Sequence, residues 1–187
     1  MTTNLPTQES QNSDEALVQL ATAGDSAAFG VLVGRYEDRL HRYARKFFAG
    51  EEDRQDLVQE VFIKAYVNLR SFDTTRRFSP WLYRIAHNEF VNGLKRQIKL
   101  PFALADIDVL LPQSTIEDAQ SALERIETVA LVHALLDRLD LRYREPLLLY
   151  YLEEMTYQEI ADILRIPTAT VGVRLRRGRL ALQKLAS

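Results

Sequence analysis

The sequence predicts an all-α protein made of two small helical bundles that are joined by a flexible acidic linker. Apolar residues recur at spacings of three and four over several long stretches, which is the pattern of amphipathic helices. Glycine occurs seven times and proline six times among 187 residues, which is few for a protein built of tight hairpins. Between residues 101 and 122 the helical spacing stops, and this segment separates the two bundles.

Composition excludes several classes of site. The chain has no cysteine, so disulfides, thiol nucleophiles and thiolate zinc sites are absent, and its three scattered histidines cannot replace them. No apolar run approaches the roughly 20 residues that a membrane span requires. The polar N-terminus lacks the basic start and apolar stretch of a secretory signal. We therefore expect a cytoplasmic protein without membrane insertion, catalytic site, metal or cofactor.

Charge is distributed unevenly, although the net charge is only −2. Residues 165–187 hold six basic side chains and no acidic one, and residues 76–99 hold six basic side chains and one acid. The intervening residues 101–127 hold six acids and one arginine. Two basic zones separated by an acidic segment indicate two surfaces that could each meet a nucleic acid.

The first bundle is expected over residues 13–100, after a disordered segment at 1–12. A short helix should run from Asp14 to Ala23 and stop at Gly24, and Asp25 should cap the next helix. That helix carries one apolar stripe over about five turns. The stripe consists of Phe29, Leu32, Val33, Tyr36, Leu40, Tyr43, Ala44 and Phe47.

Two further helices complete this bundle. One follows Gly50 with acids in its first turn, where they suit the positive end of the helix dipole. Residues 71–78 are expected to form a loop. Ser79 should then cap the last helix, with Pro80 at its first helical position, and this helix should end near Lys99.

The second bundle is expected over residues 123–187. Helical spacing returns from Leu123, and Asp140 should cap a helix that runs through Leu152. Pro146 sits late for the first turn of that helix, so either a kink or a shifted start is open.

A helix-turn-helix pattern closes the chain. Thr156 and Glu159 fit a capping box, the turn consists of residues 165–167, and Thr168 is expected to cap a basic helix. The second helix of such a motif lies in a DNA major groove, with its N-terminal residues near base edges and its arginines on phosphates. The alternative is a solvated basic helix that only closes a bundle. The cap, the turn length and the absence of acids beyond Asp162 favour DNA binding.

Aromatic and basic residues alternate in the centre of the chain. Between residues 72 and 90 the sequence interleaves five aromatic rings with Arg76, Arg77 and Arg84. Arginines can hold the phosphates of a single strand, and aromatic faces can accept unstacked bases. The alternative is that these rings form the core, and core contact is the favoured role of Trp81, whereas DNA contact is favoured for Arg76, Arg77 and Asn88.

These motifs together resemble the extracytoplasmic-function (group 4) sigma factors of bacterial RNA polymerase. The resemblance rests on four motifs in the order typical of that family, between about residues 14 and 185. They are Asp56-Leu-Val-Gln-Glu-Val-Phe62, Phe78-x-x-Trp-Leu-Tyr-Arg-Ile-Ala-x-Asn88, Glu159-Ile-Ala-x-x-Leu164 and Thr170-Val171-x-x-Arg174.

The resemblance implies that the first bundle is sigma region 2 and the second is sigma region 4. It implies binding to core RNA polymerase by Asp56, Leu57, Gln59, Glu60 and Phe62. It implies reading and melting of the minus-ten promoter element by Arg76, Arg77, Phe78, Trp81, Arg84 and Asn88. It implies reading of the minus-thirty-five element by Thr168, Thr170, Val171, Arg174, Arg176, Arg177 and Arg179. An anti-sigma factor is a further implied partner, beside core RNA polymerase and promoter DNA.

The chain departs from the family pattern at three places. Gly172 and Val173 stand where the family has a basic residue and a serine, and both are expected to face the groove. Gly178 replaces a usual alanine, and Arg165 stands in the turn where glycine is common. We expect the fold to survive and the sequence preference to differ.

Two other functions were open at the level of sequence. A dimeric helix-turn-helix repressor or activator would explain the C-terminal arginines but would leave the segments 56–62 and 72–90 without a role. A helical scaffold would leave the basic helix unexplained. Asp56 and Glu60, taken alone, could simply form an exposed helix face.

Overall fold

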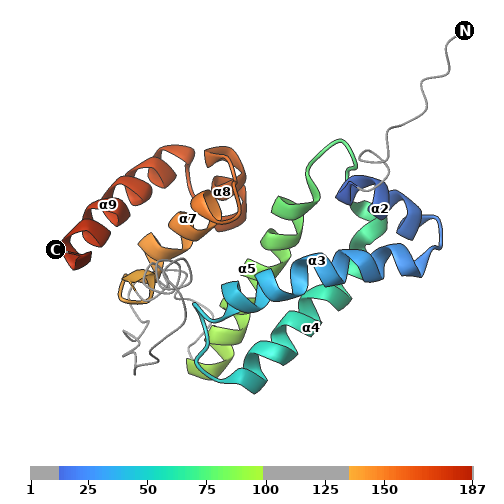
Figure 1. The fold of residues 1–187 in the computed structure, drawn as a ribbon, viewed down its shortest axis with the longest axis horizontal. Coiled ribbons are helices and arrows are strands. Elements are labelled where there is room, and N and C mark those ends of the chain that lie inside the picture. Colours follow the sequence, from blue (N-terminus) through green and yellow to red (C-terminus); the bar gives the residue numbers. More distant parts are fainter. Residues whose placement is uncertain (1–12, 99–134, 187) are drawn as a thin grey trace, which may run out of the picture. The chain divides into compact units, whose positions relative to one another are not determined.

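A computed structural model describes residues 13–98 and 135–186, and every regular element within those ranges is a helix (Figure 1). Contacts between residues divide the chain into two compact units, with the division between residues 99 and 100. The prediction of an all-α chain is confirmed. The expected disorder at 1–12, the linker at 101–122 and the helical spacing after Leu123 fall on residues outside the described ranges.

Within residues 13–98 the first unit contains four α-helices and one short 3-10 helix. They are α2 (Asp14–Thr22), α3 (Ser26–Ala44), α4 (Glu51–Asn68), η1 (Leu69–Ser71) and α5 (Phe78–Ile98). Ser13 caps α2, and the carboxylate of Asp25 accepts hydrogen bonds from the amides of Ala27 and Ala28, which confirms the predicted cap. Gly24 lies between these helices at φ +111°, a conformation that side chains with a Cβ rarely adopt.

Aromatic rings dominate the core of this unit. The ring of Tyr43 on α3 lies 5.2 Å from Phe47, 5.1 Å from Tyr83 and 5.5 Å from Phe90 between ring centroids. Such tilted and edge-on pairs add to the free energy gained by burying the rings. The predicted stripe therefore faces the core, except that Val33 is half-buried. Phe47 is buried as well, although it lies just after the end of α3.

The predicted start of α5 was wrong by two residues. The helix begins at Phe78, so Ser79 is not its cap and Pro80 is its third residue. Proline is tolerated there because amides of the first turn have no partner within the helix. A carboxylate from another helix serves this end instead, since Glu15 of α2 accepts a hydrogen bond of 2.9 Å from the amide of Phe78.

The second unit contains α7 (Leu141–Tyr151), α8 (Tyr157–Leu164) and α9 (Thr168–Ala186). Asp140 caps α7 as predicted, by accepting a hydrogen bond of 3.2 Å from the amide of Arg142. Pro146 lies inside α7, so the helix start is not shifted. Arg144 is buried, and its guanidinium donates hydrogen bonds to the carbonyls of Leu139 and Asp137, which precede the helix.

The helix-turn-helix is formed by α8 and α9. Thr156 and Glu159 make the predicted capping box, with hydrogen bonds of 3.2 Å and 2.7 Å in the two directions. The predicted cap of α9 was wrong, because Thr168 is the first helical residue. Its hydroxyl instead donates a hydrogen bond of 3.1 Å to the side-chain oxygen of Gln158, and so ties the start of α9 to α8.

Arg165 ends α8 in the left-handed conformation, at φ 55° and ψ 44°. This conformation costs about 1 kcal/mol for a residue with a Cβ. Arg165→Gly should therefore raise the free energy of unfolding of the second unit by about 1 kcal/mol, or its Tm by roughly 5 °C. Thermal unfolding by circular dichroism measures this. Arg177→Gly, at an exposed position inside α9, should instead lower the free energy of unfolding. A loss of stability in both variants would show that the left-handed backbone at Arg165 is not strained.

Candidate functional site

One face of α9 packs on α7 and α8. Val171 and Leu175 are fully buried, and Gly178 is buried against Leu147 of α7. Val171 was expected to read the minus-thirty-five element, and that expectation was wrong because its side chain is 0% exposed. Its side chain packs α9 against the rest of the second unit. Motif resemblance alone cannot separate a residue that supports a recognition helix from one that reads bases.

The opposite face of α9 is exposed and cationic. Arg176, Arg177 and Arg179 are exposed, whereas Thr170 and Arg174 are half-buried. Arg179 donates a hydrogen bond of 3.3 Å to the hydroxyl of Tyr151 on α7, and this bond raises the pKa of the guanidinium above its usual value. A helix with exposed arginines after its first two turns matches the recognition helix of a helix-turn-helix protein.

Gly172 and Val173 differ in orientation, although both were expected to face the groove. A Cβ placed on Gly172 would lie 3.5 Å from a ring carbon of Tyr157, so this position faces α8. Gly172 is itself half-buried, and its orientation toward the groove stays a prediction. Val173 is 42% exposed.

The loop between η1 and α5 carries the central basic residues. Arg76, Arg77 and Arg84 are exposed, and Asn88 is half-buried further along α5. Arg76 lies 3.7 Å from the carboxylate of Asp73. Hydrogen bonds from Thr75 to Asp73 lower the pKa of that carboxyl and hold the loop in a turn. These cations are thus presented on one segment and its following helix.

The aromatic residues of this segment are mostly core. Phe78 was expected to contact the minus-ten element, and that expectation was wrong because its side chain is buried at 1% exposure. The ring of Trp81 is half-buried, 5.2 Å from Phe72 and 5.6 Å from Phe78 between centroids. Trp81 therefore makes the core contact that was favoured for it, while part of the indole remains accessible beside the cationic loop.

The motif expected to bind polymerase lies on α4, and its five residues divide by exposure. Asp56 and Gln59 are exposed and Glu60 and Phe62 are half-buried, whereas Leu57 is buried. A Cβ placed on Gly93 of α5 would lie 3.1 Å from a methyl group of Leu57, so Leu57 packs between α4 and α5. Its predicted role in direct polymerase contact was wrong.

Glu60 belongs to a charge network between α4 and α5. Its carboxylate lies 3.5 Å from the ammonium of Lys64 and 3.7 Å from the guanidinium of Arg96. Lys64 also donates a hydrogen bond to the buried carboxylate of Glu89, which raises the pKa of the lysine. Because Glu60, Lys64 and Arg96 are partly solvated, the ion pairs among them fix side-chain positions more than they stabilise the fold.

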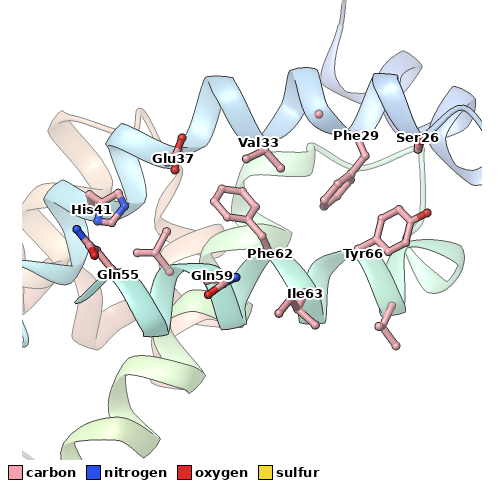
Figure 2. A pocket seen from close by; sticks show the side chains of 13 residues that line it. Ser26, Phe29, Val33, Glu37, His41, Gln55, Gln59, Phe62, Ile63 and Tyr66 are labelled. Atoms are coloured by element: carbon pink, nitrogen blue, oxygen red, sulfur yellow. The ribbon is translucent and has the colours of Figure 1, made fainter. Parts of the chain in front are cut away.

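An apolar groove of about 760 Å³ runs between α3 and α4. Figure 2 shows Val33 of α3 and Phe62 of α4 facing each other across it. The groove continues onto Ile63, which is 56% exposed, and Val67, which is 73% exposed. Sequence reasoning missed these two residues. The signal was available, since α4 carries adjacent apolar pairs at 62–63 and 66–67 and so has apolar side chains beyond its core stripe.

Within residues 13–98 and 135–186 no cluster of three histidine or acidic side chains could hold a metal ion. No helix in the same ranges is long and apolar enough to cross a bilayer.

Comparison with known proteins identifies both units. Residues 32–99 match the family described as Sigma-70 region 2, and residues 130–182 match Sigma-70, region 4. The ECF RNA polymerase sigma factor SigW of Bacillus subtilis is 36% identical over 171 residues, covering 86% of this chain and 90% of SigW. The ECF RNA polymerase sigma-E factor of Escherichia coli K12 is 32% identical, and the match covers 92% of this chain and 93% of that factor.

The solved structure of CnrH, in complex with the cytosolic domain of CnrY, superposes with a TM-score of 0.65. CnrH is 32% identical, and the match covers 92% of this chain and 96% of CnrH. Both the sequence relatives and this structure span nearly the whole chain. The chain therefore belongs to the extracytoplasmic-function family of RNA polymerase sigma factors.

Proposed function

We propose a division of labour between the two units of this sigma factor, which directs core RNA polymerase to promoters. In the first unit, a domain over residues 13–100 binds polymerase through α4 and engages the minus-ten element through the loop before α5. In the second unit, a domain over residues 123–187 places α9 in the major groove of the minus-thirty-five element. Residues 101–122 connect the units. The observation that carries this proposal is one exposed cationic surface on each unit of a single chain.

The polymerase surface of the first unit is formed by Asp56 and Gln59, with Glu60 and Phe62 beside them. Asp56 and Gln59 are exposed on α4, and Gln59 and Phe62 also line the apolar groove. Interfaces of this kind combine an apolar centre with a polar rim, and the groove and its flanking carboxylate and amides offer both.

The minus-ten surface acts on single-stranded DNA. Arg76, Arg77 and Arg84 hold phosphates, while Asn88 and the accessible part of Trp81 contact bases. Stacking or capture of one base contributes about 1–3 kcal/mol, which is comparable to the few kcal/mol needed to extrude it from the duplex. Strand separation then needs no nucleotide hydrolysis, and the chain acts as a non-enzymatic factor in the cytoplasm.

A protein inhibitor that covers the polymerase surface is a further expected partner. The family resemblance implies an anti-sigma factor, and CnrH forms a complex with the cytosolic domain of another protein. The matches to two sigma regions decide against the conventional dimeric repressor.

Run-off transcription tests the proposed function. Purified core polymerase and genomic fragments should give new, defined transcription starts when the chain is added, and none of these starts with polymerase alone. A repressor would leave initiation unchanged or reduce it, and that result would overturn the proposal.

Arg176 and Arg177 should contribute phosphate contacts at the upstream element. Changing both to alanine should weaken binding of the holoenzyme to promoter DNA. It should also reduce the magnitude of the slope of log K against log salt by about 1.8, because each phosphate contact that is lost no longer releases its share of counterions. Titrations at several salt concentrations measure this slope. Arg138→Ala, at an exposed position ahead of α7, should leave it unchanged. An unaltered slope in the double variant would remove both arginines from the phosphate surface.

A further inference from the structure

The exposed face of α9 has an apolar centre. The buried residues Val171, Leu175 and Gly178 define the inward direction, and Val173 lies almost opposite to it on the helix. Ala169, which is also exposed, lies one turn earlier on the same line. Val173, at 42% exposure, therefore lies on the surface that carries the arginines proposed to bind DNA.

Cations border this apolar centre on its C-terminal side. Arg176 and Arg177 follow Val173 by three and four residues, so they lie on either side of its line one turn further on. If those two arginines rest on phosphates, the turn before them is the part of α9 that enters the major groove. Val173 is then directed at base edges, while Gly172 remains against Tyr157.

A valine side chain has neither a donor nor an acceptor, so it cannot read the polar edge of a base. The one methyl group that the four bases present in the major groove is the C5-methyl of thymine. We infer that Val173 reads a thymine in the upstream promoter element by contact with this methyl group. The inference rests on the proposed placement of α9, and it assigns base preference at a position where the family pattern has serine.

Replacement of thymine by uracil tests the contact, because it removes the methyl group and keeps every hydrogen-bonding group of the base pair. A promoter found by run-off transcription is prepared with each thymine of its upstream element changed to uracil in turn, on either strand. Holoenzyme with the unaltered chain should lose about fourfold in affinity at one position, the loss expected for one buried methyl group.

Holoenzyme with Val173→Ala should bind the thymine promoter about fourfold more weakly and should no longer distinguish uracil at that position. Leu180→Ala is the matched control, because Leu180 is an apolar residue 52% exposed on the same helix, two turns further from the groove. It should keep the full dependence on the methyl group. Circular dichroism of each variant checks that its helices are retained.

The outcomes separate this inference from the proposed function. If no defined start forms, the proposed function fails. If starts form but no uracil substitution changes affinity, or if Val173→Ala keeps the dependence, the assignment of Val173 is overturned while the function stands. An upstream element without thymine would also overturn it.

Discussion

Ile63→Asp should lower the affinity of the chain for core RNA polymerase by about 100-fold, which corresponds to about 3 kcal/mol. Ile63 is 56% exposed at the edge of the groove between α3 and α4, next to Gln59 and Phe62. In the free chain a carboxylate there remains in water, so the fold should be unaffected. In the complex the same carboxylate would be buried without a partner, and this desolvation carries the loss.

Val31→Asp is the matched control for this variant. Val31 is an apolar residue on α3, 45% exposed, and it does not line the groove. Both variants should unfold at the same temperature as the unaltered chain. Fluorescence anisotropy with labelled chain and core polymerase measures the two affinities, and only Ile63→Asp should lose binding. Equal affinities for the two variants would remove the groove from the polymerase surface.

Helix existence and three of the caps could be predicted from sequence, because both depend on neighbours within a few residues. Asp25, Asp140 and Thr156 cap the helices expected of them, through side-chain contacts two or three residues ahead. The start of α5 could not be predicted in this way. Its cap comes from Glu15, 63 residues earlier in the chain, and local sequence contains no signal for that contact.

In the candidate site, too, local features could be predicted from sequence and packing between helices could not. The type and spacing of charged residues predicted the exposed arginines of the loop at 73–77 and of α9. Leu57, Phe78 and Val171 belong to the same motifs, yet all three are buried. A family retains a motif for folding as well as for contact with partners. Only the packing against other helices shows which motif residues form the core and which remain available for contact.

Gly178 illustrates a pairing between helices that the sequence conceals. It stands where the family usually has alanine, and a Cβ there would lie 2.8 Å from a methyl group of Leu147 on α7. Leu147 is itself 2% exposed, so it has little room to move away. The space that alanine would take on α9 is occupied by the leucine of α7.

Gly178→Val should therefore cost the second unit about 3 kcal/mol, because three added carbons must displace a buried side chain. A bundle this small has little stability to lose, so α7 to α9 should either be unfolded or unfold at a temperature far below that of the unaltered chain. Amide hydrogen exchange of these helices in the full chain measures the loss.

Gly172→Val is the control, because its Cβ would meet Tyr157 at an ordinary 3.5 Å. It should change the free energy of unfolding by no more than about 0.5 kcal/mol. Adding Leu147→Ala to Gly178→Val removes as many carbons as the valine adds and should recover more than half of the loss. Equal destabilisation by valine at both glycines, or no recovery in the double variant, would show that the contact with Leu147 does not explain the glycine.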